Sequence, residues 1–406
     1  MASIDNSDLQ VNTTGLDTLP VELLEMIGKA LIGDSASMSK FARSCRKTYL
    51  AMIPILNQAV VLRSQDDIPW RMMLARFPNV AGKLESLTLH FHSTPVVDAT
   101  YYPLVTNFTL LLAQFNSLQT LTIKGCGWNR PMNPNPRNRV LFQDVFRQSA
   151  NGTVLPKLET LNLSIGDHHV WRCDIDAILN HPRLKTLSIL GAKIYCNVDL
   201  LPPKRSTPLE ELTLLCCTVS PATMTSLLSA PKALTRLIYK GFPRVGWTAY
   251  GNFEADSYIE AFKEHKESIQ YMDFDIFETA GFYDSPVDLF MFTALEDLTI
   301  RPELLYGTCP LDPPAGHCLL PSSLRHLTCW WVHPRAFSSF QGNIASHIRG
   351  WISHGGLPNF RTLTLETPLP TTTGWPRLET WLTVSWKKLR RGQFFPLLCH
   401  CCHYRV

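Results

Sequence analysis

The sequence predicts an α/β protein, in which a short helical module is followed by a solenoid of parallel strands. Two observations lead to this prediction. A hexad with the pattern L-x-x-L-x-L recurs ten times between Leu84 and Leu365, with helical patterns between many of its copies. Ahead of the first copy, "LDTLPVELLEMIGKAL" (residues 16–31) reads as a helix that is apolar around most of its circumference.

Composition limits the class of protein. The chain has 406 residues, of which 45% are apolar and 18% charged, so it can form a large core. A net charge of +4 is too small to indicate nucleic acid as the main partner. We expect no signal peptide and no membrane span, because no apolar run is long enough. Twelve cysteines without a pairing rhythm predict reduced thiols and a cytoplasmic or nuclear location.

The first residues divide into a tail and a module. Residues 1–15 are polar, and we expect them to be disordered. In the helix that follows, Pro20 suits the first turn, and Glu22 favours the positive end of the helix dipole. Only Glu22, Glu25, Gly28 and Lys29 are left for a polar side. The apolar arc is therefore about twice the ~100° that a helix on a single core requires.

A second helical pattern, "SMSKFARSCRKTYLAMI", spans residues 37–53, and Pro54 is expected to limit it. The whole module, residues 16–57, is too small to bury its apolar surface by itself. Part of that surface must be covered by the solenoid or by another protein.

Each hexad has the period-two pattern of a short strand. Its fourth and sixth positions are apolar, while the fifth is Thr, Ser or Asn in eight of the ten copies, which predicts one buried and one polar face. The copies are "LESLTL", "LQTLTI", "LETLNL", "LKTLSI", "LEELTL", "LTRLIY", "IQYMDF", "LEDLTI", "LRHLTC" and "FRTLTL". "LETWLTVSW" from Leu378 is a candidate for an eleventh copy.

Helical patterns between the hexads predict crossovers that join parallel strands, as in "DIDAILNHPRL", "SPATMTSLLSAPKAL" and "SYIEAFKEHKESI". Ser220 and Pro221 form a helix start signal. A doubly wound α/β sheet is the alternative, but its strands would be apolar on both faces. The solenoid is therefore predicted for residues 58–395, with strands on its inner face and helices outside. Pro-rich stretches at 129–138, 202–208 and 309–321 are expected to be surface loops.

These hexads resemble a leucine-rich repeat array, although their spacing along the chain is irregular and an Asn ladder is missing. The module resembles an F-box, with "LPVELLEMIGKAL" followed by "MSKFARSCRKTYLAMIPIL". The order of the two is similar to that in fungal F-box proteins with leucine-rich repeats. The resemblance implies a non-catalytic substrate receptor of a cullin-type (SCF) ubiquitin ligase. Its F-box would dock on the S-phase-kinase-associated adaptor protein, and its repeats would bind an unknown target.

Carried onto this sequence, the resemblance assigns docking contacts to both helical patterns. They are Leu19, Pro20, Glu22, Leu23, Leu24, Ile27, Leu31, Phe41, Cys45 and Tyr49. The alternative is that these residues cap the open end of the solenoid core. In that case the chain would be an interaction scaffold with no role in ubiquitin transfer.

Target recognition is expected on the inner face, where the polar positions change character along the chain. They are small and neutral in the early copies and become charged or aromatic later. The candidate target-binding residues are Arg236, Lys240, Tyr271, Asp273, Asp275, Asp297, Arg301, His326 and Trp330. The alternative for this stripe is a set of ion pairs that satisfy one another. On the target-binding interpretation, charge reversal of Arg236 and Arg301 would abolish target capture without unfolding the protein.

No catalytic motif is found in the sequence, and we expect no catalytic residues, cofactor or metal site. The end of the chain, residues 396–406, holds Cys399, His400, Cys401, Cys402 and His403. Their spacing is too tight for an ordinary zinc site. We expect a disordered tail, with metal binding or palmitoylation of Cys401 or Cys402 as alternatives.

Overall fold

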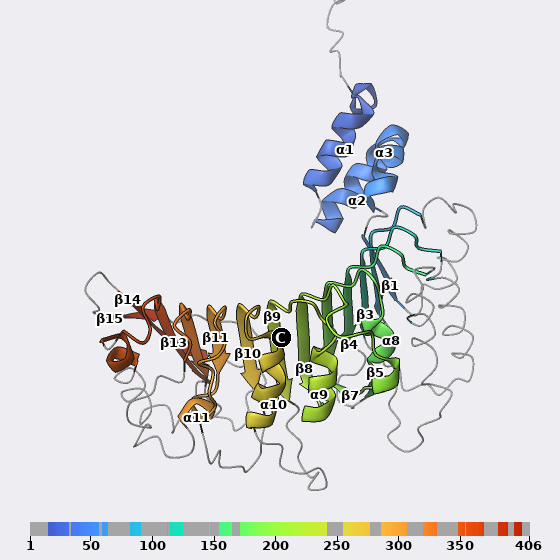
Figure 1. Cartoon of the computed structure of the whole chain (residues 1–406). Helices are drawn as coiled ribbons and strands as arrows, with labels where there is room; N and C mark the ends of the chain where they lie inside the picture. Colours follow the sequence, from blue (N-terminus) through green and yellow to red (C-terminus); the bar gives the residue numbers. More distant parts are fainter. Residues whose placement is uncertain are drawn as a thin grey trace, which may run out of the picture.

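The computed structural model shows a helical module at one end of a long sheet (Figure 1). It describes residues 15–31, 34–56, 59–63, 82–90, 112, 114–124, 146, 154–164, 171–241, 255–276, 286–306, 320–330, 348–353, 355–368, 381–388 and 394–399. The prediction of a disordered N-terminus falls on residues that lie outside these ranges, apart from Gly15. The same holds for the 129–138 loop and for most of the 309–321 loop.

Within the described residues, the sheet has thirteen strands in chain order, with β5 and β7 set apart as a separate pair. Its strands are β1 (Ala59–Arg63), β2 (Ser86–His90), β3 (Thr120–Lys124), β4 (Thr160–Ser164), β6 (Thr186–Leu190), β8 (Glu211–Cys217), β9 (Arg236–Gly241), β10 (Tyr271–Asp275), β11 (Asp297–Ile300), β12 (His326–Trp330), β13 (Thr362–Pro368), β14 (Trp381–Lys388) and β15 (Phe394–Cys399). Neighbours from β1 to β13 pair parallel. Each of the ten hexads contributes one of these strands, so the predicted α/β repeat architecture is confirmed.

The strands are held in register by a repeated backbone pattern. The carbonyl of Glu85, at the second hexad position, accepts hydrogen bonds from Gln119 N at 2.8 Å and Thr120 N at 3.0 Å. The equivalent carbonyl does the same in each later copy, as far as Arg325 O, which accepts from Arg361 N and Thr362 N. The third hexad positions of neighbouring copies are therefore aligned, even where a long segment separates two copies in the sequence.

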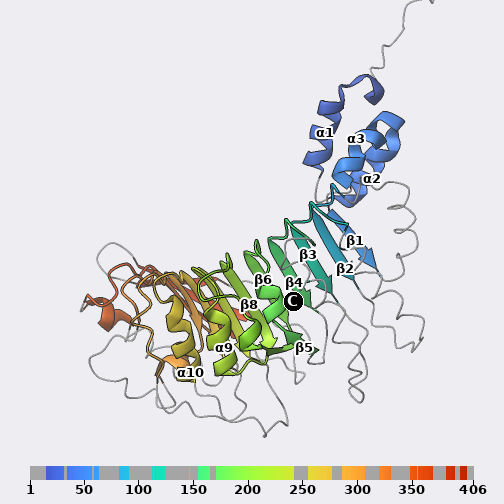
Figure 2. The ribbon, with the colours of Figure 1, turned by 45° about the vertical axis from the view of Figure 1, so that its right-hand side comes forward.

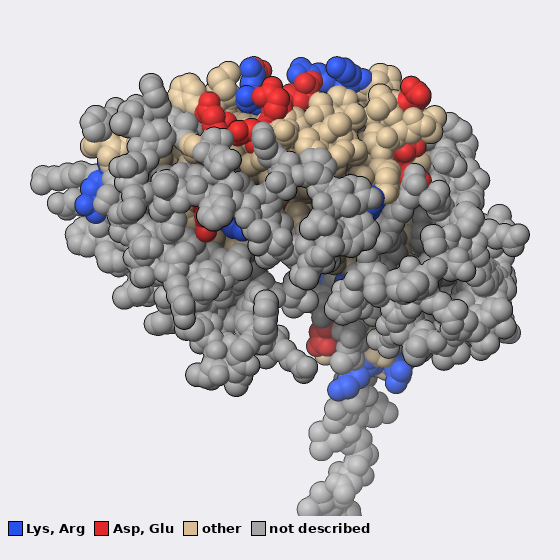
Figure 3. Space-filling model, turned by 90° about the horizontal axis from the view of Figure 1, so that it is seen from below, with Lys and Arg blue, Asp and Glu red and all other residues tan. Residues whose placement is uncertain are grey.

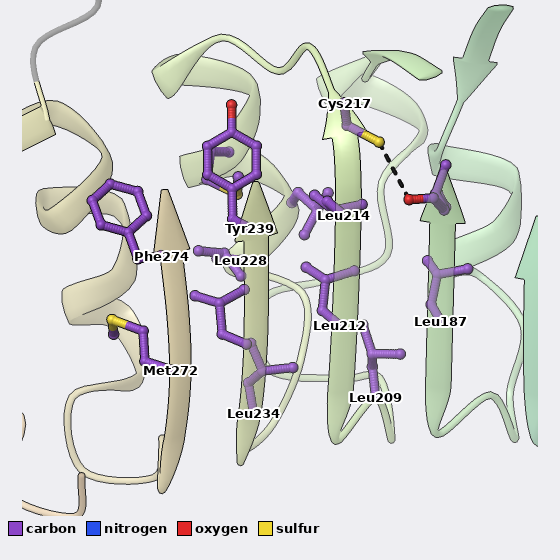
Figure 4. Packing of buried hydrophobic residues seen from close by; sticks show 14 of the residues in the cluster. Leu187, Leu209, Leu212, Leu214, Cys217, Leu228, Leu234, Tyr239, Met272 and Phe274 are labelled. Carbon is purple, nitrogen blue, oxygen red and sulfur yellow. Dashed lines mark hydrogen bonds between the residues drawn. The ribbon is translucent and has the colours of Figure 1, made fainter. Parts of the chain in front are cut away.

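The core lies behind the strands, where the first, fourth and sixth hexad positions are buried in one continuous cluster. Figure 4 shows this packing, with Leu212 and Leu214 of one copy beside Leu187 and Tyr239 of its neighbours. In this region Cys217 Sγ donates a hydrogen bond to Ile189 O at 3.3 Å. A thiol thus links two copies in an array that lacks the Asn ladder.

Short helices cover the outer side of the sheet (Figures 1 and 2). They are α8 (Asp176–Leu179), α9 (Pro221–Leu228), α10 (Ala255–Phe262) and α11 (Pro302–Tyr306), with 3-10 turns at Val198–Leu200 and Lys263–His265. The start signal of α9 is confirmed, because Ser220 Oγ accepts from Thr223 N at 3.1 Å. The two-stranded sheet of β5 (Trp171–Asp174) and β7 (Ala192–Tyr195) lies outside the main sheet.

The helical module contains a 3-10 turn (Leu16–Thr18) and three helices, α1 (Val21–Ala30), α2 (Ser35–Ser44) and α3 (Arg46–Leu56). Gly28 brings α1 close to α3, because a Cβ at this position would lie 2.2 Å from Met52 Sδ. The assignment of Gly28 to a polar side was wrong, since the residue is buried against α3. A small residue on a helix can be a packing contact, which the helical wheel does not reveal.

The second helical pattern is two helices, which corrects the prediction of one. Cys45 adopts an extended conformation between α2 and α3, with φ −156° and ψ 168°. The hydrogen bonds of Thr48 then start α3 afresh. Pro54 does not limit this helix, which continues to Leu56.

At the other end of the sheet, β14 and β15 reverse direction and pair antiparallel with β13 and with each other. The segment around "LETWLTVSW" is therefore a strand, but not an eleventh parallel copy. β15 also crosses the predicted boundary at residue 396 and includes Cys399. Residues 400–406 lie outside the described part of the chain. None of the described helices is long and apolar enough to pass through a bilayer.

Candidate functional site

The helical module keeps a large apolar surface exposed. On α1, Leu23 is 44% exposed, Met26 64% and Ile27 37%, and Val21 is exposed near the start of the helix. On α3, Tyr49 and Leu50 are also exposed. We call these six residues the exposed apolar set of the module. Burying all six removes a large apolar area from water, which favours association with another molecule.

The module stands beyond the first strand of the sheet instead of lying across its core (Figures 1 and 2). Helix α1 packs on α3, and α3 in turn contacts β1. The exposed apolar set remains exposed with the whole chain present, so the sheet does not cover it. Capping of the array therefore does not account for these six side chains.

The predicted docking residues divide into exposed and interior positions. Pro20, Glu22, Leu23, Ile27 and Tyr49 are exposed. Leu19, Leu31, Phe41 and Cys45 are partly buried.

Leu24 has an exposed fraction of 0%, which corrects its assignment as a partner contact. It lies on the same side of α1 as the buried Gly28, and so belongs to the interior of the module. Sequence reasoning left Met26, Val21 and Leu50 out of the contact set. For Met26 a signal existed, because it is three residues after Leu23 on the same helix.

Cys45 has a local role at the start of α3. Its Sγ accepts from Thr48 N at 3.4 Å, while Thr48 Oγ1 accepts from Cys45 N at 3.0 Å and donates to Cys45 O at 2.7 Å. This is a reciprocal cap of the kind that Ser and Thr usually make. The hydrogen bonds from Thr48 lower the pKa of the Cys45 thiol below its ordinary value.

The nine predicted target-binding residues lie on four neighbouring strands or directly after one, and the register places them in three rows across the inner face. Arg236, Tyr271, Asp297 and His326 align at the start of β9 to β12. Asp273 lies in the middle row. Lys240 and Asp275 align at the far end, where Arg301 directly follows β11 and Trp330 ends β12. The structure therefore brings together residues from four separate copies of the hexad.

An ion-pair network joins the middle row to the far row. Lys240 Nζ lies 2.8 Å from Asp273 Oδ2, and the Arg301 guanidinium contacts both the Asp275 carboxylate and Ile276 O. The two cations also lie over the ring of Trp330, at 5.5 Å for Lys240 Nζ and 5.6 Å for Arg301 Cζ from its centroid.

Burial shows which of these groups a partner could reach. The side chains of Asp275 and Arg301 are 3% and 10% exposed, and that of Asp273 is 9% exposed. Burial raises the pKa of Asp275, an effect that the Arg301 charge opposes. Their assignment as target contacts is corrected, because these three side chains are almost fully buried and form their ion pairs inside the fold, Asp273 with Lys240 and Asp275 with Arg301. The expectation that charge reversal of Arg301 leaves the fold intact is contradicted by this burial, since reversal would leave Asp275 facing a second buried acid. The expected loss of target capture stays a prediction.

Glu303 is a further member of this network that sequence reasoning missed. It lies in α11, two residues after Arg301, and burial raises the pKa of its carboxyl group. Its Oε2 is buried and makes no hydrogen bond with the described residues. The sequence held no signal for it, because an acid in the first turn of a helix is usually solvated.

The first row remains open to solvent. Arg236, Tyr271, Asp297 and His326 are all partly exposed. The Arg236 guanidinium stacks on the Tyr271 ring, with Cζ 3.7 Å from its centroid. Glu211 of β8 aligns with Arg236 and extends this row, although the predicted set did not include it.

Elsewhere on the surface, charges of both signs are mixed. In the view from below, acidic and basic side chains lie close to one another across the described part of this side (Figure 3). One example is Lys263, whose Nζ lies 2.7 Å from Glu260 Oε2. The described residues contain no group of three or more His, Cys, Asp and Glu side chains arranged to hold a metal ion.

Comparisons with known proteins do not place this chain in a family. No protein-family model matches the chain, and no curated protein matches it.

Proposed function

We propose that this protein is a substrate-recognition adaptor of an SCF-type E3 ubiquitin ligase. In this proposal the helical module is an F-box that docks on the S-phase-kinase-associated adaptor protein, and through it on a cullin. The strands form a leucine-rich repeat solenoid whose inner face holds the target. The chemistry of ubiquitin transfer belongs to the recruited partners.

One observation carries this proposal, which is that Leu23, Met26 and Ile27 are exposed although the chain has a sheet nearby that could cover them. An apolar helix face of this size on a small module is typical of a protein-protein interface. The resemblance of residues 19–31 to the F-box supports the choice of partner. The division of the chain into a helical module and a sheet also fits a protein that binds two partners at once.

The test is direct binding of the purified adaptor protein to the full chain. In the variant Leu23→Asp/Ile27→Asp, two exposed apolar contacts become charged without a change in the interior of the module. Interface hot spots of this kind are worth about 2 kcal/mol or more together, so we expect affinity to fall by at least about 30-fold.

A matched control comes from the array, where Val198 and Leu200 are 66% and 50% exposed. The variant Val198→Asp/Leu200→Asp introduces the same charges on an exposed apolar site far from the module, and should bind the adaptor like the wild type. If Leu23→Asp/Ile27→Asp also binds normally, the docking role is rejected. The chain would then be better described as an interaction scaffold with a helical cap.

A further inference from the structure

The ion-pair network of the inner face holds more acids than bases. Lys240 pairs with Asp273, and Arg301 pairs with Asp275. Glu303 is the third acid, and its Oε2 is buried without a hydrogen bond to any described residue. Because each pair is neutral by itself, an ionised Glu303 leaves the network with one negative charge that neither pair balances.

The surroundings of Glu303 solvate a charge poorly. Its chain neighbours Pro302 and Leu304 are both buried. Cys329 of β12 is fully buried and lies near it, since burial raises the pKa of the Cys329 thiol and the charge of Glu303 adds to this effect. In such a place a carboxylate is more costly in its charged form than in its neutral form. Burial accordingly raises the pKa of the Glu303 carboxyl group.

The other titratable and charged groups around the network come from successive strands. They are Cys216 of β8, Lys240 of β9, Asp273 and Asp275 of β10, Arg301 directly after β11, Cys329 of β12 and Glu366 of β13, which aligns with Trp330. Burial raises the pKa of both thiols, so they stay neutral. Glu366 is partly exposed, so water can solvate its charge. Among the acids of the network, Glu303 is therefore the one whose charge the fold opposes most directly.

We propose that Glu303 is a proton acceptor that gives the network behind the inner face a charge dependent on pH. With a proton on Glu303 the network is neutral, and its two ion pairs are undisturbed. Without that proton, one uncompensated negative charge remains in the interior. This switch belongs to the array itself and does not depend on the function proposed for the chain.

The direction of the effect on stability follows from the state that binds the proton more tightly. The pKa of Glu303 is raised in the folded chain above the ordinary 4.5. The stability that the neutral carboxyl group contributes is therefore complete below pH 4.5, and it is lost as the pH rises through the raised pKa. At neutral pH the wild type should be less stable than a variant that cannot ionise at this position.

The test is urea unfolding of the full chain and of Glu303→Gln, between pH 4.5 and 7.5. We expect the urea midpoint of the variant to exceed that of the wild type by about 0.3 M at pH 7.5. The difference should shrink as the pH falls towards 4.5. All other titrating groups are the same in the two proteins, so their pH effects cancel in this difference.

Two further variants separate this role from a purely structural one. Asp275→Asn removes an acid that holds Arg301, so it should lower the midpoint instead of raising it. Glu267 is exposed, and Glu267→Gln should differ from the wild type by the same amount at every pH. The proposal is overturned if Glu303→Gln fails to fold, if it is no more stable than the wild type at pH 7.5, or if its advantage does not change with pH.

Discussion

At the scale of single residues, Gly28 determines whether the helical module can close. A Cβ here would lie 2.2 Å from Met52 Sδ and 2.8 Å from Ile55 Cδ1, so Gly28→Ala requires these two buried side chains, or α1 itself, to shift. We expect a loss of about 1–3 kcal/mol in the stability of the module, as for other overpacked interiors. Hydrogen exchange of the α1 and α3 amides in the full chain measures this loss.

The control for that variant is Gly350→Ala, because a Cβ at Gly350 meets nothing within 4 Å. Exchange in the module should be unchanged in this variant. Equal protection of α1 in Gly28→Ala and the wild type would contradict the expected loss of stability.

Arg301 is a second residue at which a substitution tests the interior of the protein, because its side chain is both charged and buried. Arg301→Met leaves the Asp275 carboxylate buried without its main cation, which typically costs about 3–5 kcal/mol. Urea unfolding of the full chain should show this loss. The double variant Arg301→Met/Asp275→Asn should recover part of it, because the uncompensated charge is gone. If the double variant is no more stable than Arg301→Met, the pair is not a coupled unit.

These two residues also show what the sequence could and could not predict. The pattern of Arg236, Tyr271 and Asp297 was enough to place them on one face, because strand side chains alternate with a period of two. Burial of Asp275 and Arg301 depends on contacts between separate copies of the hexad, which no local pattern records. Leu24 and Leu23 look alike in sequence, and only the position of α3 determines which of them is buried.

At the scale of elements, the start of α3 depends on one reciprocal cap. Thr48 is fully buried, and its hydroxyl satisfies both Cys45 N and Cys45 O. Thr48→Val keeps the shape of the side chain and removes both bonds, so we expect a cost of about 1–2 kcal/mol. Hydrogen exchange measures this loss, and the amides in the first turn of α3 should exchange faster than in the wild type.

Cys45→Ser is the corresponding conservative change, since serine is a preferred residue at a helix start. It should leave the protection of α3 close to that of the wild type. If Thr48→Val leaves exchange unchanged, the cap does not hold the break between α2 and α3. The sequence did not reveal this break, because apolar spacing continues through Cys45 and cysteine is an unusual capping residue.

At the scale of the whole molecule, two buried histidines connect successive copies of the repeat. His181 Nε2 bonds Leu155 O at 3.0 Å, and its Nδ1 accepts from Arg183 N. His265 repeats the arrangement with Leu228 O at 2.7 Å and Leu234 N. Because Nδ1 accepts, each ring is neutral with its proton on Nε2.

Burial lowers the pKa of both histidines below the ordinary 6.5. Protonation is thus easier in the unfolded chain, and the stability that these rings contribute is complete above pH 6.5. It is lost as the pH falls from there through the lowered pKa. We expect the melting temperature to drop over this interval, and to drop less in His181→Gln/His265→Gln. His326→Gln, at a partly exposed histidine, should behave like the wild type, and an identical pH profile for all three would contradict this role.

The overall architecture was the most predictable feature, because ten similar hexads each specify a strand with one buried face. The reversal at β14 was not predictable, since strand direction leaves no mark on the apolar pattern of a single strand. The position of the module beyond β1 depends on its contact with the first strand of the array. The sequence of the module does not reveal this contact.

The ladder of second-position carbonyls has a consequence for how this protein can change. Copies joined by short segments and copies joined by long ones meet in the same alignment, so the length of a connecting segment does not affect the spacing of the inner rows. Segments between strands can therefore grow, shrink or receive a foreign epitope during evolution or engineering, while the polar rows of the inner face keep their geometry.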